Sequence, residues 1–166
     1  MAQLRWVVLL ICLGSASAQA QSQGGGGVFL DISGGATVGY SRILDAQRPI
    51  YGLSLRSGTT FLSSYTSGLT LLFGIDLHFP SPNLFGAGLG YTLFPVGDAV
   101  MFRVSALIFG FSSLNYELAL GPELELQYQP VDWPVGIVFR AGGMMGIVGS
   151  DALMGRGTIG VVWKQG

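Results

Sequence analysis

Apolar and polar residues alternate along most of the chain from residue 28 onward, and a helical period is poorly developed. The clearest run lies between Tyr116 and Tyr128, where every second residue is apolar or proline and the intervening positions include Glu117, Glu123 and Glu125. Such period-two alternation is typical of a β-strand with one apolar face. Eight segments of this kind, separated by turns rich in Gly, Pro, Asn, Asp, Ser or Thr, are predicted at residues 28–40, 50–62, 68–79, 84–94, 99–111, 116–128, 135–148 and 153–164.

The length of these segments suits strands that cross a membrane. Twelve residue steps of about 3.3 Å, tilted by about 40°, rise roughly 30 Å, which matches the thickness of the hydrocarbon core. Pro122 lies inside the sixth segment, and because proline has no N–H to donate we expect a bulge or a missing hydrogen bond there. Aromatic residues near strand ends are predicted to form an interfacial girdle: Tyr40, Tyr51, Phe79, Phe85, Tyr116, Tyr128 and Trp163.

The apolar faces could point into a soluble barrel or out towards lipid. A soluble barrel would have a glycine-rich outer surface with few charges, since the chain has 27 glycines and 10% charged residues, against about 25% in soluble domains. A membrane barrel turns its apolar face to lipid, and closure satisfies every backbone group. The sequence therefore predicts an all-β fold, an eight-stranded antiparallel up-and-down transmembrane β-barrel over residues 28–164.

Composition narrows the alternatives further. The formal net charge of −1 and the lack of a basic run argue against nucleic-acid binding. No run of 18 apolar residues follows the N-terminal region, so no transmembrane helix is predicted.

Ten charged residues fall within the predicted strands, and each lies on the less apolar face, which lines the lumen of a membrane barrel. Five are acidic and five are basic, as expected where an unpaired buried charge costs roughly several kcal/mol. Arg103, the two glutamates 123 and 125, and Arg140 should lie at similar heights and form an ion-pair cluster, which Arg56 and Arg156 could extend towards Asp31. With the single histidine, the predicted lumenal network comprises Asp31, Arg56, Asp76, His78, Arg103, Glu117, Glu123, Glu125, Arg140, Arg156 and Lys164. The other charges of the mature chain are expected in turns: Arg42, Asp45, Arg48, Asp98, Asp132 and Asp151.

The N-terminus resembles a secretory signal peptide over residues 1–20, with Arg5 before a short apolar run and small residues at the cleavage site. Residues 21–27 are predicted to be a Gly-rich flexible leader. Cys12 belongs to the apolar run, so cleavage leaves a chain without cysteine and excludes disulfides and thiol chemistry.

The signal peptide, the eight alternating segments and the terminal run Thr158-Ile159-Gly160-Val161-Val162-Trp163 together resemble the small eight-stranded outer-membrane barrels of the OmpA transmembrane domain and OmpX type. The last run is similar to the C-terminal assembly signal of these proteins, although three residues follow the aromatic. The resemblance implies location in the bacterial outer membrane and insertion by its general assembly machinery. It also implies that the chain begins and ends in the periplasm, with short outward connections near residues 42–49, 80–83, 112–115 and 149–152.

An enzymatic reading depends on His78, because lipid-modifying barrels of the PagL and PagP type use His and Ser. His78 shares the predicted inward face with Asp76, and no His-x-Ser pair exists in the sequence. Glu123 and Glu125 fit a structural ion-pair cluster better than acid–base catalysis, and the glycines lack the context of a phosphate-binding loop. The sequence thus predicts no catalytic, cofactor-binding or metal-binding residues.

Three functions stay open from the sequence. The first is a non-catalytic barrel, either structural or a very narrow pore whose charged lumen is plugged. The second is a lipid-modifying outer-membrane enzyme, and the third is a surface-binding or adhesion barrel, which the short connections disfavour. The expected partners are outer-membrane lipid and the assembly machinery, with no nucleic acid and no required oligomer.

Overall fold

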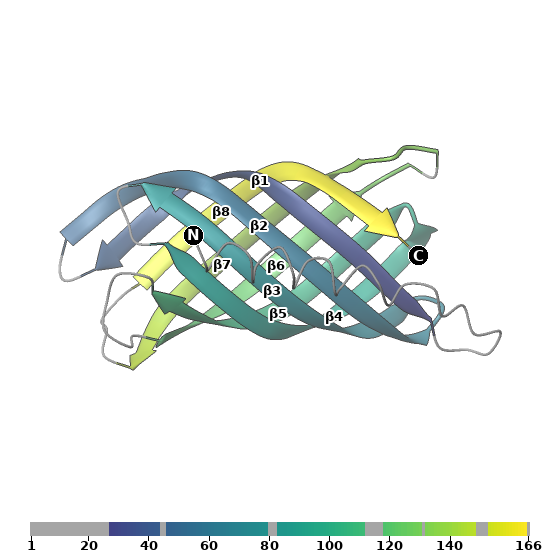
Figure 1. Ribbon diagram of the computed structural model, residues 1–166, viewed down its shortest axis with the longest axis horizontal. Coiled ribbons are helices and arrows are strands. Elements are labelled where there is room, and N and C mark those ends of the chain that lie inside the picture. Colours follow the sequence, from purple (N-terminus) through teal and green to yellow (C-terminus); the bar gives the residue numbers. More distant parts are fainter. Residues whose placement is uncertain are drawn as a thin grey trace, which may run out of the picture.

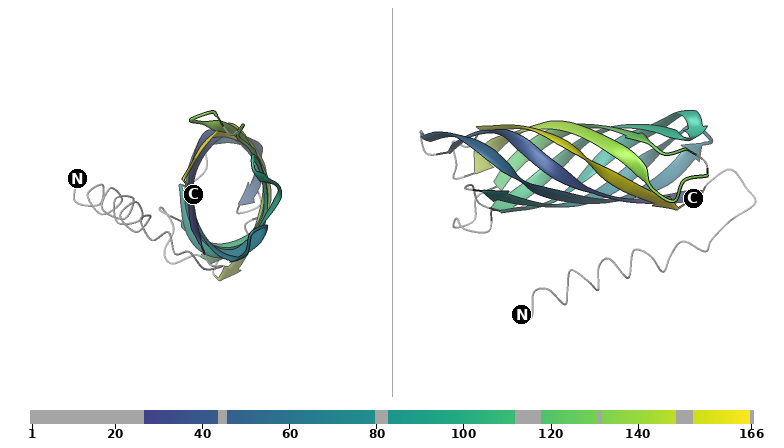
Figure 2. Two further views of the ribbon diagram at one scale, coloured as in Figure 1. Left: turned by 90° about the vertical axis from the view of Figure 1, so that its right-hand side faces the viewer. Right: turned by 90° about the horizontal axis from the view of Figure 1, so that it is seen from above.

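The computed structural model describes residues 27–43, 46–79, 83–111, 118–130, 132–148 and 153–165. These residues form eight strands, each hydrogen-bonded to its neighbours in an antiparallel closed barrel that β1 and β8 complete (Figure 1). Seen end-on, the strands form a closed ring (Figure 2). The strands are β1 Val28–Ile43, β2 Ala46–Ser64, β3 Ser67–Phe79, β4 Leu84–Asp98, β5 Val100–Phe111, β6 Leu118–Tyr128, β7 Gly136–Val148 and β8 Leu153–Gln165. The predicted fold class is confirmed.

Within the described residues, the structure has no helix that is long and apolar enough to span a bilayer.

Several strands are longer than the alternation predicts. β1 and β2 continue to Ile43 and from Ala46, so Arg42 and Arg48 lie in a paired hairpin and not in a turn. β4 also runs on to Asp98, past a register shift between Leu93 and Val96. The β1–β2 hairpin stays in unbroken register to its end, whereas the turn residues of β4 are accommodated by irregular pairing, as β-bulges commonly allow at barrel rims.

Pro122 interrupts the barrel ladder where expected. β6 pairs with β7 at Leu120–Met145 and again at Glu123–Gly142, but Gly121 and Pro122 have no partner on β7. On the other side, Pro122 pairs with β5 in unbroken register. The register with β7 is the same before and after the gap, so the proline removes local pairing without shifting the strand.

The two faces of the strands have opposite surroundings. Along β3 and β6, buried and exposed residues alternate strictly over most of the strand. The exposed positions carry apolar side chains such as Phe73, Leu118, Leu124 and Val161. The buried positions include Glu123 and Arg140, so the apolar faces point outward and the charged faces point into the bore.

The two ends of the barrel are named after the parts of the chain that lie there. At the terminal rim, β1 begins and β8 ends (right in Figure 1). At the opposite end, the loop rim, the odd-numbered strands end and the even-numbered strands begin. This arrangement matches the predicted up-and-down order, with the two chain ends of the barrel on one side.

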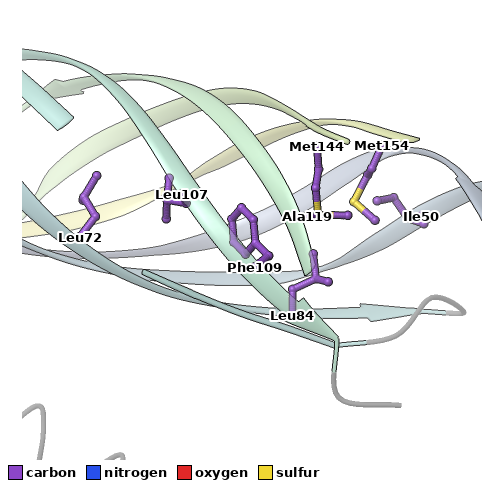
Figure 3. Packing of buried hydrophobic residues seen from close by; sticks show 8 residues of the cluster. All are labelled: Ile50, Leu72, Leu84, Leu107, Phe109, Ala119, Met144 and Met154. Carbon is purple, nitrogen blue, oxygen red and sulfur yellow. The ribbon is translucent and has the colours of Figure 1, made fainter. Parts of the chain in front are cut away.

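The bore is not polar along its full length. Strands β2 to β8 all contribute to one buried apolar cluster, most of which lies near the loop rim. We call this cluster the loop-rim layer: Ile50, Leu72, Leu84, Leu107, Phe109, Ala119, Met144 and Met154. Most of these side chains gather at that end of the bore, while Leu72 lies apart along the barrel (Figure 3). A smaller cluster, the terminal-rim layer, contains Phe29, Phe94 and Met101 with Leu62 packed against it. The charged residues therefore occupy the stretch between two apolar layers.

Candidate functional site: the ion-pair network in the bore

The charged stretch of the bore holds four arginines and four carboxylates, among the described residues, joined by salt bridges across the barrel. Their formal charges cancel. All eight side chains are at most 4% exposed, so they interact with each other and not with bulk water. They form two adjacent groups, which follow one another along the bore.

The first group contains Arg56, Asp76, Glu123 and Arg156. Arg56 donates from both terminal nitrogens to Asp76, at 2.8 and 3.0 Å, and from Nε and Nη2 to Glu123, at 3.2 and 3.0 Å. Arg156 donates to the same two carboxylates, at 3.1 Å to Glu123 and also to Asp76. Each guanidinium thus binds two carboxylates. Arginine suits this role because its planar guanidinium presents several N–H donors at once.

The second group contains Arg103, Asp31, Glu125 and Arg140. Arg103 donates to Asp31 at 2.5 Å and to Glu125 at 3.0 Å, while Arg140 donates from Nε to Glu125 at 2.7 Å. Gln127 adds N–H bonds to Glu125 at 2.8 Å and to Asp31 at 3.3 Å. The Nε atom of Arg140 also lies 3.5 Å from Glu123, which connects this group to the first.

Hydroxyl groups on the strand walls accept further hydrogen bonds from two of the arginines. Arg140 donates to the hydroxyls of Ser33 and Ser54, at 2.5 and 2.9 Å. Arg103 donates from Nε to Thr92, which is itself hydrogen-bonded to Thr70. Such extensive pairing is what allows charges to remain buried, because each unsatisfied polar group in an interior carries a desolvation cost.

The loop-rim layer contacts the first group directly through Phe109. The centre of its ring lies 4.8 Å from Cζ of Arg156 and 5.6 Å from Cζ of Arg56, within the range of cation–π attraction. The ring therefore covers the charged groups and attracts them. At the other end, Phe29 and Phe94 pack edge to face with centroids 5.0 Å apart.

Inward glycines make room for the long side chains. A Cβ at Gly58 would lie 2.6 Å from a carboxylate oxygen of Asp31, and a Cβ at Gly74 would lie 2.7 Å from a guanidinium nitrogen of Arg56. A side chain at either position would push the ion pairs apart. The glycine content of the strands is thus partly a consequence of how much charged volume the bore contains.

The structure places most residues of the predicted lumenal network inside the bore, but it pairs some of them differently. Arg56 and Arg156 bind Asp76 and Glu123 and do not extend towards Asp31, whose arginine partner is Arg103. The predicted Arg103–glutamate–Arg140 contacts are present.

Three members of that predicted network lie outside the two groups. His78 is buried on the inward face of β3 with a backbone N–H bond to Asn83. Lys164 lies half-buried near the end of β8, and Glu117 lies outside the described residues.

Sequence reasoning missed the two apolar layers, because it assigned apolar side chains to the outer wall. The sequence nevertheless indicated these layers, because residues separated by an even number of positions along a strand point to the same side. Phe109 and Met101 are separated by even numbers of residues from Arg103, so they must point inward with it.

The aromatic residues predicted for the girdle lie on the outer wall. Tyr40, Tyr51, Phe79 and Phe85 are exposed near the loop rim, where Tyr51 pairs with Phe79 across β2 and β3. Tyr128 and Trp163 are exposed near the terminal rim, and Tyr116 lies outside the described residues. Further exposed aromatics near the terminal rim were not anticipated: Phe61, Tyr65, Tyr91 and Trp133.

The outer wall between the rims has no charge among the described strand residues. Arg42 and Arg48 are the exposed charged side chains of the strands, and both belong to the β1–β2 hairpin at the loop rim. No cluster of three His, Cys, Asp or Glu suited to a metal ion occurs in the described part of the chain.

No family model and no curated protein matches this sequence. The structure, however, is similar to Neisserial surface protein A, with a TM-score of 0.55 and 12% identity over 84% of this chain and 99% of that one. It is also similar to Ail, the attachment invasion locus protein of Yersinia pestis in complex with the heparin analogue sucrose octasulfate, with a TM-score of 0.51 and 14% identity over 83% of this chain and 99% of that one. The chain therefore has the fold of the small eight-stranded outer-membrane barrels, as its sequence resemblance predicts.

Proposed function

We propose that the protein is an integral outer-membrane β-barrel that acts as a sealed structural element and not as a pore. The observation that carries this proposal is the separation of its surfaces: the described wall between the rims is apolar, and the four arginines and four carboxylates of the network are paired inside. In water such a wall would drive aggregation, whereas in a bilayer it meets acyl chains.

The sealed bore follows from its three consecutive layers. An ion or solute entering from the loop rim would have to pass the loop-rim layer, then two groups of interlocked ion pairs, then the terminal-rim layer. An eight-stranded barrel has an interior that side chains can fill. We expect no channel events from the purified protein in planar bilayers, and steady conductance would contradict the sealed bore.

Membrane insertion can be tested by charge on the outer wall. Ile108 is exposed on β5, three residues before the strand ends, and Ile108→Arg would place a guanidinium among acyl chains at a cost that reaches about 2–4 kcal/mol at the bilayer midplane. We expect the wild-type barrel to fractionate with the outer membrane and to migrate faster unboiled than boiled. Ile108→Arg should lose much of the faster band, while the control Ile108→Met should keep it. Equal behaviour of the two variants would contradict a lipid-facing wall.

We infer that the barrel is not an enzyme, because its chemistry-bearing groups are committed to structure. His78 is buried inside the barrel and not on the lipid-facing wall where an acyl chain would lie. Glu123 forms salt bridges with three arginines and Glu125 with two. Mass spectrometry of lipid A and phospholipids from cells with and without the protein should show no difference, and a new or missing lipid species would contradict this inference.

We propose that the last strand, β8, is the part of the barrel that the outer-membrane assembly machinery recognises. β8 presents Ile159, Val161 and Trp163 outward in alternation, near the end at which the chain leaves the barrel. We expect the general assembly machinery to recognise this alternation of outward apolar residues. Trp163→Ser should lower the amount of folded barrel in the outer membrane, and the outward substitution Phe73→Ser on β3 should lower it less.

A further inference from the structure

A hollow in the outer wall lies over β7 and β8. It is a groove of about 470 Å³, a size typical of ligand sites, and its walls include Val38, Leu124, Phe139 and Ile159. Its floor contains Ala141 and Gly157, which pair with each other on the outward side of β7 and β8. The groove is therefore apolar and lies where the barrel faces lipid.

The glycines of this region are not explained by packing inside the barrel. A Cβ at Gly155 would have nothing within 4 Å, and a Cβ at Gly157 would meet its nearest atom at 3.9 Å. Elsewhere glycine is needed, since a Cβ at Gly88 would lie 2.1 Å from a backbone oxygen. The outward glycines at 155 and 157 thus leave space on the outer wall that the fold itself does not require.

A positive charge lies on the loop-rim side of the groove. Along β1 the outward residues Val38, Tyr40 and Arg42 pair in turn with Gly157, Gly155 and Leu153 of β8. Arg42 is exposed, and the Tyr40 hydroxyl donates to Gln47 at 3.2 Å across the hairpin. An apolar groove with a guanidinium four residues further along β1 from its lining residue Val38 is complementary to a lipid with an anionic headgroup.

We propose that this groove binds one acyl chain of a phosphate-bearing lipid, with Arg42 neutralising the headgroup. The proposal rests on the proposed membrane location of the barrel and assigns a lipid class to its outer wall. Burial of each further methylene group in the groove strengthens binding several-fold, and the charge at the rim selects anionic over zwitterionic headgroups.

The test is native mass spectrometry of the detergent-released barrel after incubation with defined lipids. The probes are dimyristoyl phosphatidylglycerol, phosphatidylcholine with the same chains, and bisphosphorylated lipid A. We expect one retained lipid, with the anionic lipids retained above phosphatidylcholine. The anionic lipid with the larger retained fraction identifies the source as phospholipid or glycolipid, and either result supports the proposal.

Two pairs of variants separate the groove from the rest of the wall. Gly157→Leu fills the hollow, and Gly155→Leu, a second variant, fills the open space between the hollow and Arg42. Each should lower lipid retention about tenfold. Ala87→Leu, also outward and exposed but on β4 across the barrel, should leave retention unchanged. Equal retention in the Gly157, Gly155 and Ala87 variants would overturn the proposal.

The second pair tests the charge. Arg42→Gln should remove the preference for anionic lipid, while Arg48→Gln on the same hairpin should preserve it. A preference that survives Arg42→Gln would overturn the proposal, and so would a dimer that Gly157→Leu abolishes, since a second copy would then be the occupant. Heat-dependent migration of each variant reports the folded barrel separately. Loss of that migration in the wild type would contradict the proposed function and not the groove.

Discussion

The bore and the outer wall belong to the same strands but are held in different ways. Inside, each charged residue depends on named partners: Arg140, for example, binds Glu125, Ser33 and Ser54 from three other strands. Outside, the neighbouring residues Phe139 and Ala141 face away from the barrel and have lipid as their proposed surroundings. The side chains of the bore therefore require specific matches, whereas those of the wall require only to be apolar. Substitutions of equal size should have unequal effects on the two sides.

The largest difference is expected for the loss of one buried charge. Arg103→Met leaves Asp31 without its arginine partner and removes one of two partners of Glu125, which should destabilise the barrel by about 3–5 kcal/mol. The measurement is the urea midpoint for unfolding from lipid vesicles. Arg103→Met combined with Asp31→Leu restores neutrality and keeps the Arg140–Glu125 pair, so it should recover part of the loss. A double variant less stable than the single one would contradict electrostatic matching as the reason.

The second-largest difference between the bore and the outer wall is expected for the removal of an aromatic ring. Phe109 is fully buried beneath two guanidinium groups, and Phe109→Ala should cost about 3–5 kcal/mol through a cavity and lost cation–π contact. Phe73 is 57% exposed on the outer wall, where lipid can fill the space that its ring leaves. Phe73→Ala should therefore cost less than half as much in the same urea titration. Equal costs would show that the loop-rim layer is not a packed interior.

Glycine substitutions give a smaller and cleaner contrast. Gly58→Ala places a methyl group 2.6 Å from Asp31 and 3.0 Å from Arg103, so it should destabilise the barrel by about 1–3 kcal/mol. Gly155→Ala enters open space and should be neutral, or stabilising by about 0.4–1 kcal/mol because alanine restricts the unfolded chain. The two midpoints can be compared directly, and a reversed order would contradict the close packing of the bore.

The smallest expected effect is that of salt. Exposed ion pairs weaken when the Debye length falls from roughly 10 Å to 3 Å between about 0.1 and 1 M salt, but buried pairs are screened much less. Because all eight members of the network are buried, the urea midpoint should change little over this range. A steep loss of stability with salt would indicate that water and ions enter the bore.

The sequence predicts the wall of this barrel better than its bore. Alternation along β3 and β6 is regular, so the outward positions follow from parity alone. Charge on one parity also predicts which face is buried, and the balance of signs predicts pairing. Within the bore, however, the partner of each arginine depends on heights set by the stagger between strands. Asp31 faces Gly58 on β2 but binds Arg103 from β5, and the alternation of either strand alone contains no information on that contact.

The rims are the other region that pattern reasoning describes less well. Turn residues such as Pro95 and Gly97 suggested an early end to β4, yet the strand continues past an irregularity to Asp98. Local turn preference and long-range pairing compete at such positions, and pairing with β5 prevails here. The apolar layers were missed for a related reason, since Phe109 and Phe29 contradict the simple rule that greasy side chains of a membrane barrel face lipid.

The ion pairs connect segments that are distant along the chain: Arg56 meets Glu123 across 67 residues, and Arg103 meets Asp31 across 72. The β2–β3 hairpin contains one matched pair, Arg56 and Asp76, but Glu123 of β6 and Arg156 of β8 complete that group. A sheet that lacks these later strands would therefore leave part of the network unmatched in a low-dielectric medium. That penalty disappears when the seam between the first and last strands closes. The completed cylinder is thus the state in which all eight charges of the network are matched, so the energetic value of the ion pairs depends on closure of the barrel.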